Sequence, residues 1–190
     1  MTAQTGGFWN LSNKLTLFRI GAIPLLALLL GFFPEKWPSF IAAFIFLLAA
    51  VSDGLDGYLA RRGNMVSNVG KLLDPLADKL LVCIALVMLI PLGRVSAWIV
   101  AVVIGREMVV TTLRGVSAAD GVIIAANWTG KLKAFTQLVA TNFLILHYSY
   151  FSLDIHRIGT IMIWIALVLT VWSGLDFIFR YRRMPSGPIR

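Results

Sequence analysis

The chain has few charged side chains, a single cysteine and only two histidines. Its 190 residues include 17 Lys and Arg, 9 Asp and Glu, 2 His and one cysteine, Cys83. A single cysteine excludes a disulfide framework and a cysteine-based zinc site. Because Cys83 stands in the apolar run 80–89, we expect a small apolar side chain that faces lipid or a neighbouring helix.

Apolar residues fill most of the other positions. Hydrophobic residues make up 58% of the chain and charged residues 14%, and the mean hydropathy is +0.83. An ordinary soluble domain is about 25% charged, so this chain has too little polar surface for a water-soluble globule and too little charge for disorder. The net charge of +8 therefore does not indicate a nucleic-acid partner. We expect an all-α integral membrane protein in contact with membrane lipids, with a single domain over residues 1–190.

Hydrophobic segments separated by glycine, proline and polar residues predict six transmembrane helices, because each span needs about 20 apolar residues. They are expected near residues 15–33, 38–60, 73–90, 96–116, 133–150 and 158–179. Before the first span, apolar residues recur at spacings of three and four, namely Phe8, Leu11, Leu15 and Phe18. This spacing predicts a short amphipathic helix on the membrane surface. Residues 184–190 are expected to form a flexible tail.

The distribution of basic residues predicts the orientation of the chain. If the N-terminus is cytoplasmic, 14 of the 17 bases fall on the cytoplasmic side, and only Lys36, Arg94 and Arg157 fall on the other. Such an excess follows the positive-inside rule and predicts that both termini are cytoplasmic. Because the chain is compact and shows no transit-like leader, we expect a bacterial inner membrane.

Acidic residues gather at the end of one hydrophobic segment and at the start of the next. Four of the nine acids fall within 26 positions: Asp53, Asp56, Asp74 and Asp78. Carboxylates at membrane depth are costly and are retained mainly for function. At about 100° per helical residue, Asp53 and Asp56 lie about 60° apart on one face. Gly57 and Ala60 share that face, so two oxygen ligands stand beside two positions with almost no side chain.

The next helix repeats this arrangement, with Gly70, Asp74 and Asp78 at spacings of four. Two such faces opposite each other would place four carboxylates around one cavity. These groups repel unless a cation neutralises them, and hard divalent ions such as Mg²⁺ or Mn²⁺ prefer oxygen ligands. The small residues let a phosphate-bearing ligand approach the backbone, and Arg61 can meet its charge. The alternative, salt bridges to nearby bases, explains two acids better than four on matched faces.

Written out, these residues form one continuous pattern: Asp53-x2-Asp56-Gly57-x2-Ala60-Arg61-x8-Gly70-x3-Asp74-x3-Asp78. The pattern resembles the complete signature of the CDP-alcohol phosphotransferases. Members of this family are six-helix membrane enzymes, usually homodimers, that transfer a phosphatidyl or related group from a CDP-linked donor to an alcohol and release CMP. The signature covers 26 residues, and the six-span layout agrees over nearly the whole chain.

The resemblance implies a role for each signature residue. Two divalent ions, Mg²⁺ or Mn²⁺, would be held by Asp53, Asp56 and Asp74, with Asp78 as a partial ligand. The donor CDP-diacylglycerol would contact six positions: Asp53, Asp56, Gly57, Ala60, Arg61 and Gly70. Asp78 would be the general base, because a carboxylate beside the attacking alcohol can accept its proton. Asp56 remains the alternative base.

The remaining cytoplasmic-side bases predict the kind of acceptor. Four of them lie near one depth, beside the acidic cluster: Arg106, Arg114, Lys131 and Lys133. A neutral acceptor such as choline would not require them, so they indicate a second anion and hence a phosphorylated acceptor. Positive-inside charge is the competing explanation for any single base, although Arg106 and Arg114 lie in or at the end of an apolar helix and need partners.

Two further segments resemble the family members that make phosphatidylglycerophosphate. One is residues 10–19, in which Ser12 stands where those members often have proline, and the other is Gly105-Arg106-Glu107 with Arg114 downstream. The resemblance implies transfer from CDP-diacylglycerol to glycerol 3-phosphate. It also implies that Thr16 and Arg19 contact the donor or the acceptor.

Three alternatives remain at the sequence level. Another member of the family could use inositol phosphate, serine or phosphatidylglycerol as acceptor. A small cation transporter could use intramembrane carboxylates, although its acids would lie near the bilayer midplane rather than toward the basic side. A membrane scaffold without chemistry would not bind a cytidine nucleotide in a metal-dependent way.

Overall fold

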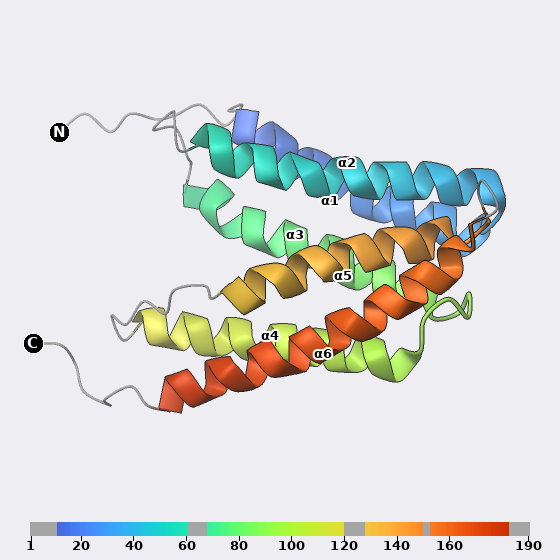
Figure 1. Cartoon of the computed structure of the whole chain (residues 1–190). Helices are drawn as coiled ribbons and strands as arrows, with labels where there is room; N and C mark the ends of the chain where they lie inside the picture. The colour runs from blue at the N-terminus through green and yellow to red at the C-terminus, as the bar shows by residue number, and fades with distance from the viewer. Residues whose placement is uncertain (1–10, 61–67, 120–127, 150–152, 183–190) are drawn as a thin grey trace, which may run out of the picture.

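Six α-helices and no strand make up the part of the chain that this computed structural model describes, residues 11–60, 68–119, 128–149 and 153–182 (Figure 1). Side chains are described for residues 16–52, 76–119, 128–149 and 153–182. The helices are α1 (Leu11–Phe32), α2 (Lys36–Ala60), α3 (Asn68–Leu89), α4 (Ala97–Ala119), α5 (Trp128–Leu146) and α6 (Ile155–Arg182). The expected all-α class is therefore confirmed.

The helix boundaries lie close to the expected spans, except at two starts. α3 and α5 each begin five residues earlier than expected, at Asn68 and Trp128. The N-terminus also differs, because α1 runs without a break from Leu11 through the segment expected to form a separate surface helix. No glycine or proline interrupts residues 11–20, so nothing there ends the first helix before the span begins. Phe8 and the expected tail 184–190 lie outside the described residues.

Successive helices run in opposite directions, and two of them occupy the middle of the bundle. α3 packs against α1, α2, α4 and α5, while α5 packs against α2, α3 and α6. α2 therefore ends, and α3 begins, at the same end of the molecule, on the left of Figure 1. We call this the signature end. It also holds the end of α4 and the start of α5.

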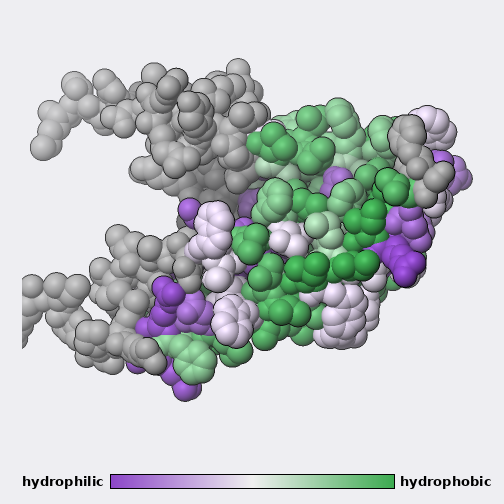
Figure 2. Space-filling model, in the orientation of Figure 1, coloured by the Kyte–Doolittle hydropathy of each residue, from purple (hydrophilic) through white to green (hydrophobic). Residues whose placement is uncertain are grey.

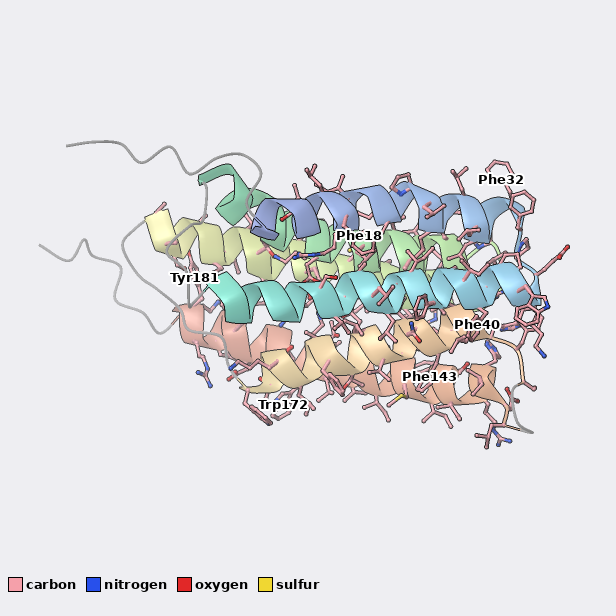
Figure 3. The ribbon with its side chains drawn as sticks, turned by 90° about the horizontal axis from the view of Figure 1, so that it is seen from above. Phe18, Phe32, Phe40, Phe143, Trp172 and Tyr181 are labelled. Carbon is pink, nitrogen blue, oxygen red and sulfur yellow. The ribbon has the colours of Figure 1, made fainter. Side chains whose placement is uncertain are left out.

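Small and aliphatic side chains form the core between the helices, and large apolar side chains cover the outside. The core includes Leu26, Phe46 and Leu86, each fully buried. Every helix also exposes large apolar side chains, for example Phe32, Phe44, Leu76, Met108, Phe135 and Trp172. Figure 2 shows the resulting apolar surface between more polar ends, and Figure 3 shows Phe32 and Trp172 pointing away from the bundle. A water-soluble protein buries such side chains rather than displaying them on every element.

Among the described residues, α6 is the one helix that is both long enough and apolar enough to cross a membrane. α1 and α2 contain shorter apolar stretches, residues 16–32 and 36–52. The helical architecture thus agrees with a membrane protein.

A buried arginine ties the connections together at the end opposite the signature. The Arg94 guanidinium donates to the carbonyl oxygens of Ile145 at 2.8 Å and Pro34 at 2.9 Å. The same group contacts the Ser39 hydroxyl, and the Tyr148 hydroxyl also donates to Pro34. These bonds join the α1–α2, α3–α4 and α5–α6 connections, so this end is held together by specific polar contacts.

Candidate active site

The signature lies on two packed helices at the signature end. Asp53, Asp56, Gly57 and Ala60 occupy the last turns of α2, and Gly70, Asp74 and Asp78 follow one another along α3. Helical spacing on both segments is as expected from the sequence. Among the eight signature residues, Asp78 is the one whose side chain is described, whereas Arg61 lies wholly outside the described residues.

Asp78 lines a partly open cavity of about 210 Å³ between α2, α3, α4 and α5. The described lining residues are Ala50, Asp78, Lys79, Val82, Cys83, Glu107, Lys133, Ala134, Phe135, Gln137 and Leu138. Ala50 is on α2, three residues before Asp53, so the cavity borders both helices that carry the signature. Acidic, basic and amide side chains from three helices thus meet beside the expected catalytic carboxylate.

A buried ion pair forms one wall of this cavity. The Lys133 ammonium on α5 donates to the Glu107 carboxylate on α4, and the two side chains are 4% and 15% exposed. Across the cavity, the Lys79 ammonium donates to the Thr111 hydroxyl at 2.5 Å. Buried charges are retained when they are paired, and this pairing keeps a lysine at the cavity wall.

Arg106 lies behind this wall rather than on it. Its guanidinium donates to Glu107 at 3.0 Å and to the Ser173 hydroxyl on α6 at 2.8 Å. A Cβ added to Gly174 would come within 3.1 Å of the Arg106 Cγ, so the absence of a side chain at Gly174 makes room for the arginine. Glu107 therefore connects Arg106 with Lys133.

The other residues expected to bind the acceptor do not line this cavity. Thr16 and Arg19 are buried on α1. Arg114 is exposed near the end of α4, with its guanidinium carbon 5.7 Å from the centre of the Phe177 ring, and Lys131 is exposed in the first turn of α5. Of the six expected acceptor-binding residues, the structure brings Lys133 together with Asp78.

Several cavity residues are not predicted by the sequence. Glu107 belongs to the Gly105-Arg106-Glu107 segment but has no predicted role in binding or catalysis, and no sequence pattern predicts such a role for Gln137 or Lys79. Cys83 is expected to face lipid or a neighbouring helix, and the structure adds that it borders this cavity between the helices. A usable signal exists for Gln137: it follows Lys133 by four residues, and two polar residues on one face of an apolar span indicate a polar interior.

The donor set of the signature suits a divalent metal ion. Four carboxylates supply the oxygen ligands that Mg²⁺ and Mn²⁺ prefer, and Asp78 extends that set to the cavity. Among the side chains described, no group of three or more His, Cys, Asp or Glu could hold a metal. Asp53, Asp56 and Asp74 lie outside that set, so their role as ligands stays a prediction.

Comparison with known proteins identifies the family. Residues 9–172 match the family model for CDP-alcohol phosphatidyltransferase. A Bacillus subtilis (strain 168) protein named CDP-diacylglycerol--glycerol-3-phosphate 3-phosphatidyltransferase is 40% identical over 181 residues, covering 89% of this chain and 93% of that protein. A protein of the same name from Escherichia coli (strain K12) is 38% identical over 175 residues, covering 90% of this chain and 93% of its own length. Together with the signature on α2 and α3, these matches show that the chain belongs to the CDP-alcohol phosphatidyltransferase family.

Proposed function

We propose that this protein transfers the phosphatidyl group of CDP-diacylglycerol to glycerol 3-phosphate, giving phosphatidylglycerophosphate and CMP. The reaction is the one for which the Bacillus subtilis and Escherichia coli relatives are named. The structural observation that supports it most strongly is the position of Asp78, which lines one cavity with the buried Lys133. A proton acceptor and an anion-binding cation therefore lie in the same small space.

A pair of Mg²⁺ or Mn²⁺ ions would be held by Asp53, Asp56 and Asp74, with Asp78 as partial ligand. When bound, these ions neutralise charge on the diphosphate and on the departing CMP. Arg61 would add a fixed positive charge beside the diphosphate. Gly57, Ala60 and Gly70 leave room for the nucleotide to approach the helix backbone.

Asp78 acts as the general base in this proposal. Its carboxylate accepts the proton of the acceptor's hydroxyl as the hydroxyl oxygen bonds to the phosphorus that carries diacylglycerol. The bond from that phosphorus to the oxygen shared with CMP breaks, and CMP leaves with the electron pair. Asp78 lines the cavity beside Lys133, which supports this role, and Asp56, whose side chain is outside the described set, stays the alternative base.

Lys133 binds the acceptor's phosphate. Its ammonium is held in place by Glu107, and one carboxylate does not use all three of its donor hydrogens. A phosphate that enters the cavity meets this ammonium while its hydroxyl end points toward Asp78. The proposed acceptor, glycerol 3-phosphate, is an anion. A buried lysine in the same cavity as the base therefore suits it better than it suits serine, which carries no phosphate.

The six helices all span the membrane in this proposal, with the signature end in the cytoplasm of a bacterium and the chain forming a homodimer. Exposed large apolar side chains on every helix support the spans. The three bases assigned to the outer side support the orientation: Lys36 starts α2, Arg94 joins α3 to α4, and Arg157 lies in the first turn of α6. All three are at the end opposite the signature.

Release of CMP by the purified protein tests the proposed acceptor. With CDP-diacylglycerol and Mg²⁺ or Mn²⁺ present, CMP should appear when glycerol 3-phosphate is added. It should not appear with serine, inositol phosphate or phosphatidylglycerol. Release with one of those acceptors and none with glycerol 3-phosphate would overturn the proposed acceptor while leaving the family assignment intact.

A further inference from the structure

A buried amide in the cavity lacks the partner that its surroundings would normally supply. Gln137 on α5 is 5% exposed and lines the cavity, and its Oε1 has no hydrogen-bond partner within the described part of the chain. Buried side-chain polar atoms are almost always hydrogen-bonded, so this amide oxygen is available to a group that enters the cavity.

The position of Gln137 indicates which group of a ligand could bond to its amide. Lys133 precedes it by four residues on the same helix face, and both line the cavity with Asp78 of α3. A ligand whose anionic end meets Lys133 and whose reacting hydroxyl meets Asp78 occupies the cavity that Gln137 also lines. The amide can accept from a hydroxyl or donate to one, so an alcohol suits it in either orientation.

The size of the cavity favours a small ligand. Its volume of about 210 Å³ lies below the range of roughly 300–1,000 Å³ that is typical of pockets for drug-sized molecules. A three-carbon phosphorylated polyol is small enough for this space.

We propose that Gln137 determines acceptor specificity by hydrogen-bonding the non-reacting hydroxyl of a phosphorylated polyol. This proposal rests on the proposed function and adds to it a residue that recognises neither the phosphate nor the reacting hydroxyl. Binding an acceptor with this hydroxyl satisfies the buried amide. An acceptor without it leaves the buried amide unpaired, and a site built to hydrogen-bond a hydroxyl rejects analogues that lack it.

Two acceptors that differ by one hydroxyl test the proposal. Glycerol 3-phosphate carries the middle hydroxyl, and 3-hydroxypropyl phosphate has the same chain length without it. The wild-type enzyme should prefer glycerol 3-phosphate by on the order of tenfold or more in kcat/KM. Equal use of both acceptors by the wild-type enzyme would overturn the proposal without any variant.

Gln137→Leu and Gln137→Met remove the amide while keeping a side chain of similar size. Both variants should lower kcat/KM for glycerol 3-phosphate and leave that for 3-hydroxypropyl phosphate nearly unchanged, so the ratio falls toward one. Thr141→Val is the matched control, because Thr141 is buried one turn further along α5 and does not line the cavity. This control should keep the wild-type ratio.

The alternative is that Gln137 only supports packing, and it predicts a different outcome. Activity with both acceptors would then fall by the same factor, and the ratio would stay at its wild-type value, which would overturn the proposal. A wild-type enzyme inactive with both acceptors but active with serine would instead contradict the proposed function itself.

Discussion

Glu107 connects the two cations that the sequence associates with the acceptor. Its carboxylate receives a hydrogen bond from Lys133 at the cavity wall and another from Arg106, which is anchored on Ser173 of α6. One acid therefore compensates two bases inside an apolar bundle. A carboxylate in this position fixes where the lysine ammonium lies before any acceptor arrives.

Removing the Glu107 charge should therefore lower both the stability of the protein and the rate of the transfer reaction. Glu107→Gln leaves Lys133 buried without a counter-charge, a change that costs about 3–5 kcal/mol in comparable buried pairs. We expect a clear fall in Tm of the purified protein in detergent. The double variant Glu107→Gln/Lys133→Met removes both charges and should recover much of the lost Tm, because no unpaired ion remains.

Activity separates the two roles of this pair. The double variant should stay poorly active with glycerol 3-phosphate even where its Tm recovers, because the cation for the phosphate is gone. Strictly additive losses of Tm in the two single variants and the double variant would show that the two side chains do not interact.

The sequence predicts which charged residues have a function better than it predicts which residues they contact. Asp78 and Lys133 were both expected at the site, because charged residues in an apolar span need a function. Gln137 and Cys83 were not, since nothing in a helical pattern tells which uncharged positions border a cavity. Conversely, Arg106 was expected at the acceptor and lies behind Glu107, because a long side chain can turn toward a neighbouring helix that the sequence does not locate.

At the scale of helices, α5 and α6 pack closely against each other. A Cβ added to Gly159 of α6 would come within 3.0 Å of the backbone nitrogen of Leu144 on α5. A backbone atom cannot move aside as the end of a flexible side chain can. Glycine at this position therefore sets how closely α6 can pack against the helix that carries Lys133 and Gln137.

Gly159→Ala should force these two helices apart and lower Tm, with a cost of about 1–3 kcal/mol for overpacking. Gly115→Ala on α4 is the matched control, because an added Cβ there meets nothing within 4 Å. Alanine is the better helix former by about 1 kcal/mol, so the control should leave Tm unchanged or raise it. A Gly159→Ala protein as stable as the control would contradict the close packing.

Helix positions were predictable because apolar runs and their punctuation are local features. Each of the six expected spans has at least one end within a few residues of the corresponding end of an observed helix. Helix contacts depend instead on long-range packing, so the central place of α3 and α5 could not be inferred from the pattern. The unbroken α1 also differs from expectation, since an amphipathic spacing does not by itself require a break before the span.

At the scale of the whole molecule, the basic residues and the apolar surface support the proposed orientation. Arg94 closes the end opposite the signature with bonds to Pro34 and Ile145. The signature end holds the carboxylates and the cavity. In the proposed orientation, a soluble acceptor enters the cavity from the cytoplasm.

Site-directed cysteine labelling of bacterial spheroplasts tests this orientation. Lys36 begins α2 and Arg182 ends α6, both exposed and at opposite ends of the bundle. In a Cys83→Ser background, a membrane-impermeant maleimide should label Lys36→Cys in intact spheroplasts and Arg182→Cys only after permeabilisation. The reverse pattern would place the signature end outside the cytoplasm.

The most direct test of the proposed catalysis compares the wild-type protein with Asp78→Asn. CMP release from CDP-diacylglycerol and CDP binding would be measured on the same preparations, with Mg²⁺ or Mn²⁺ present and absent. The wild-type protein should release CMP only when glycerol 3-phosphate and a divalent ion are both supplied. Asp78→Asn should still bind CDP and should lose about 10²–10⁴-fold in turnover, the usual contribution of a general base. CMP release by Asp78→Asn at the wild-type rate would contradict the account.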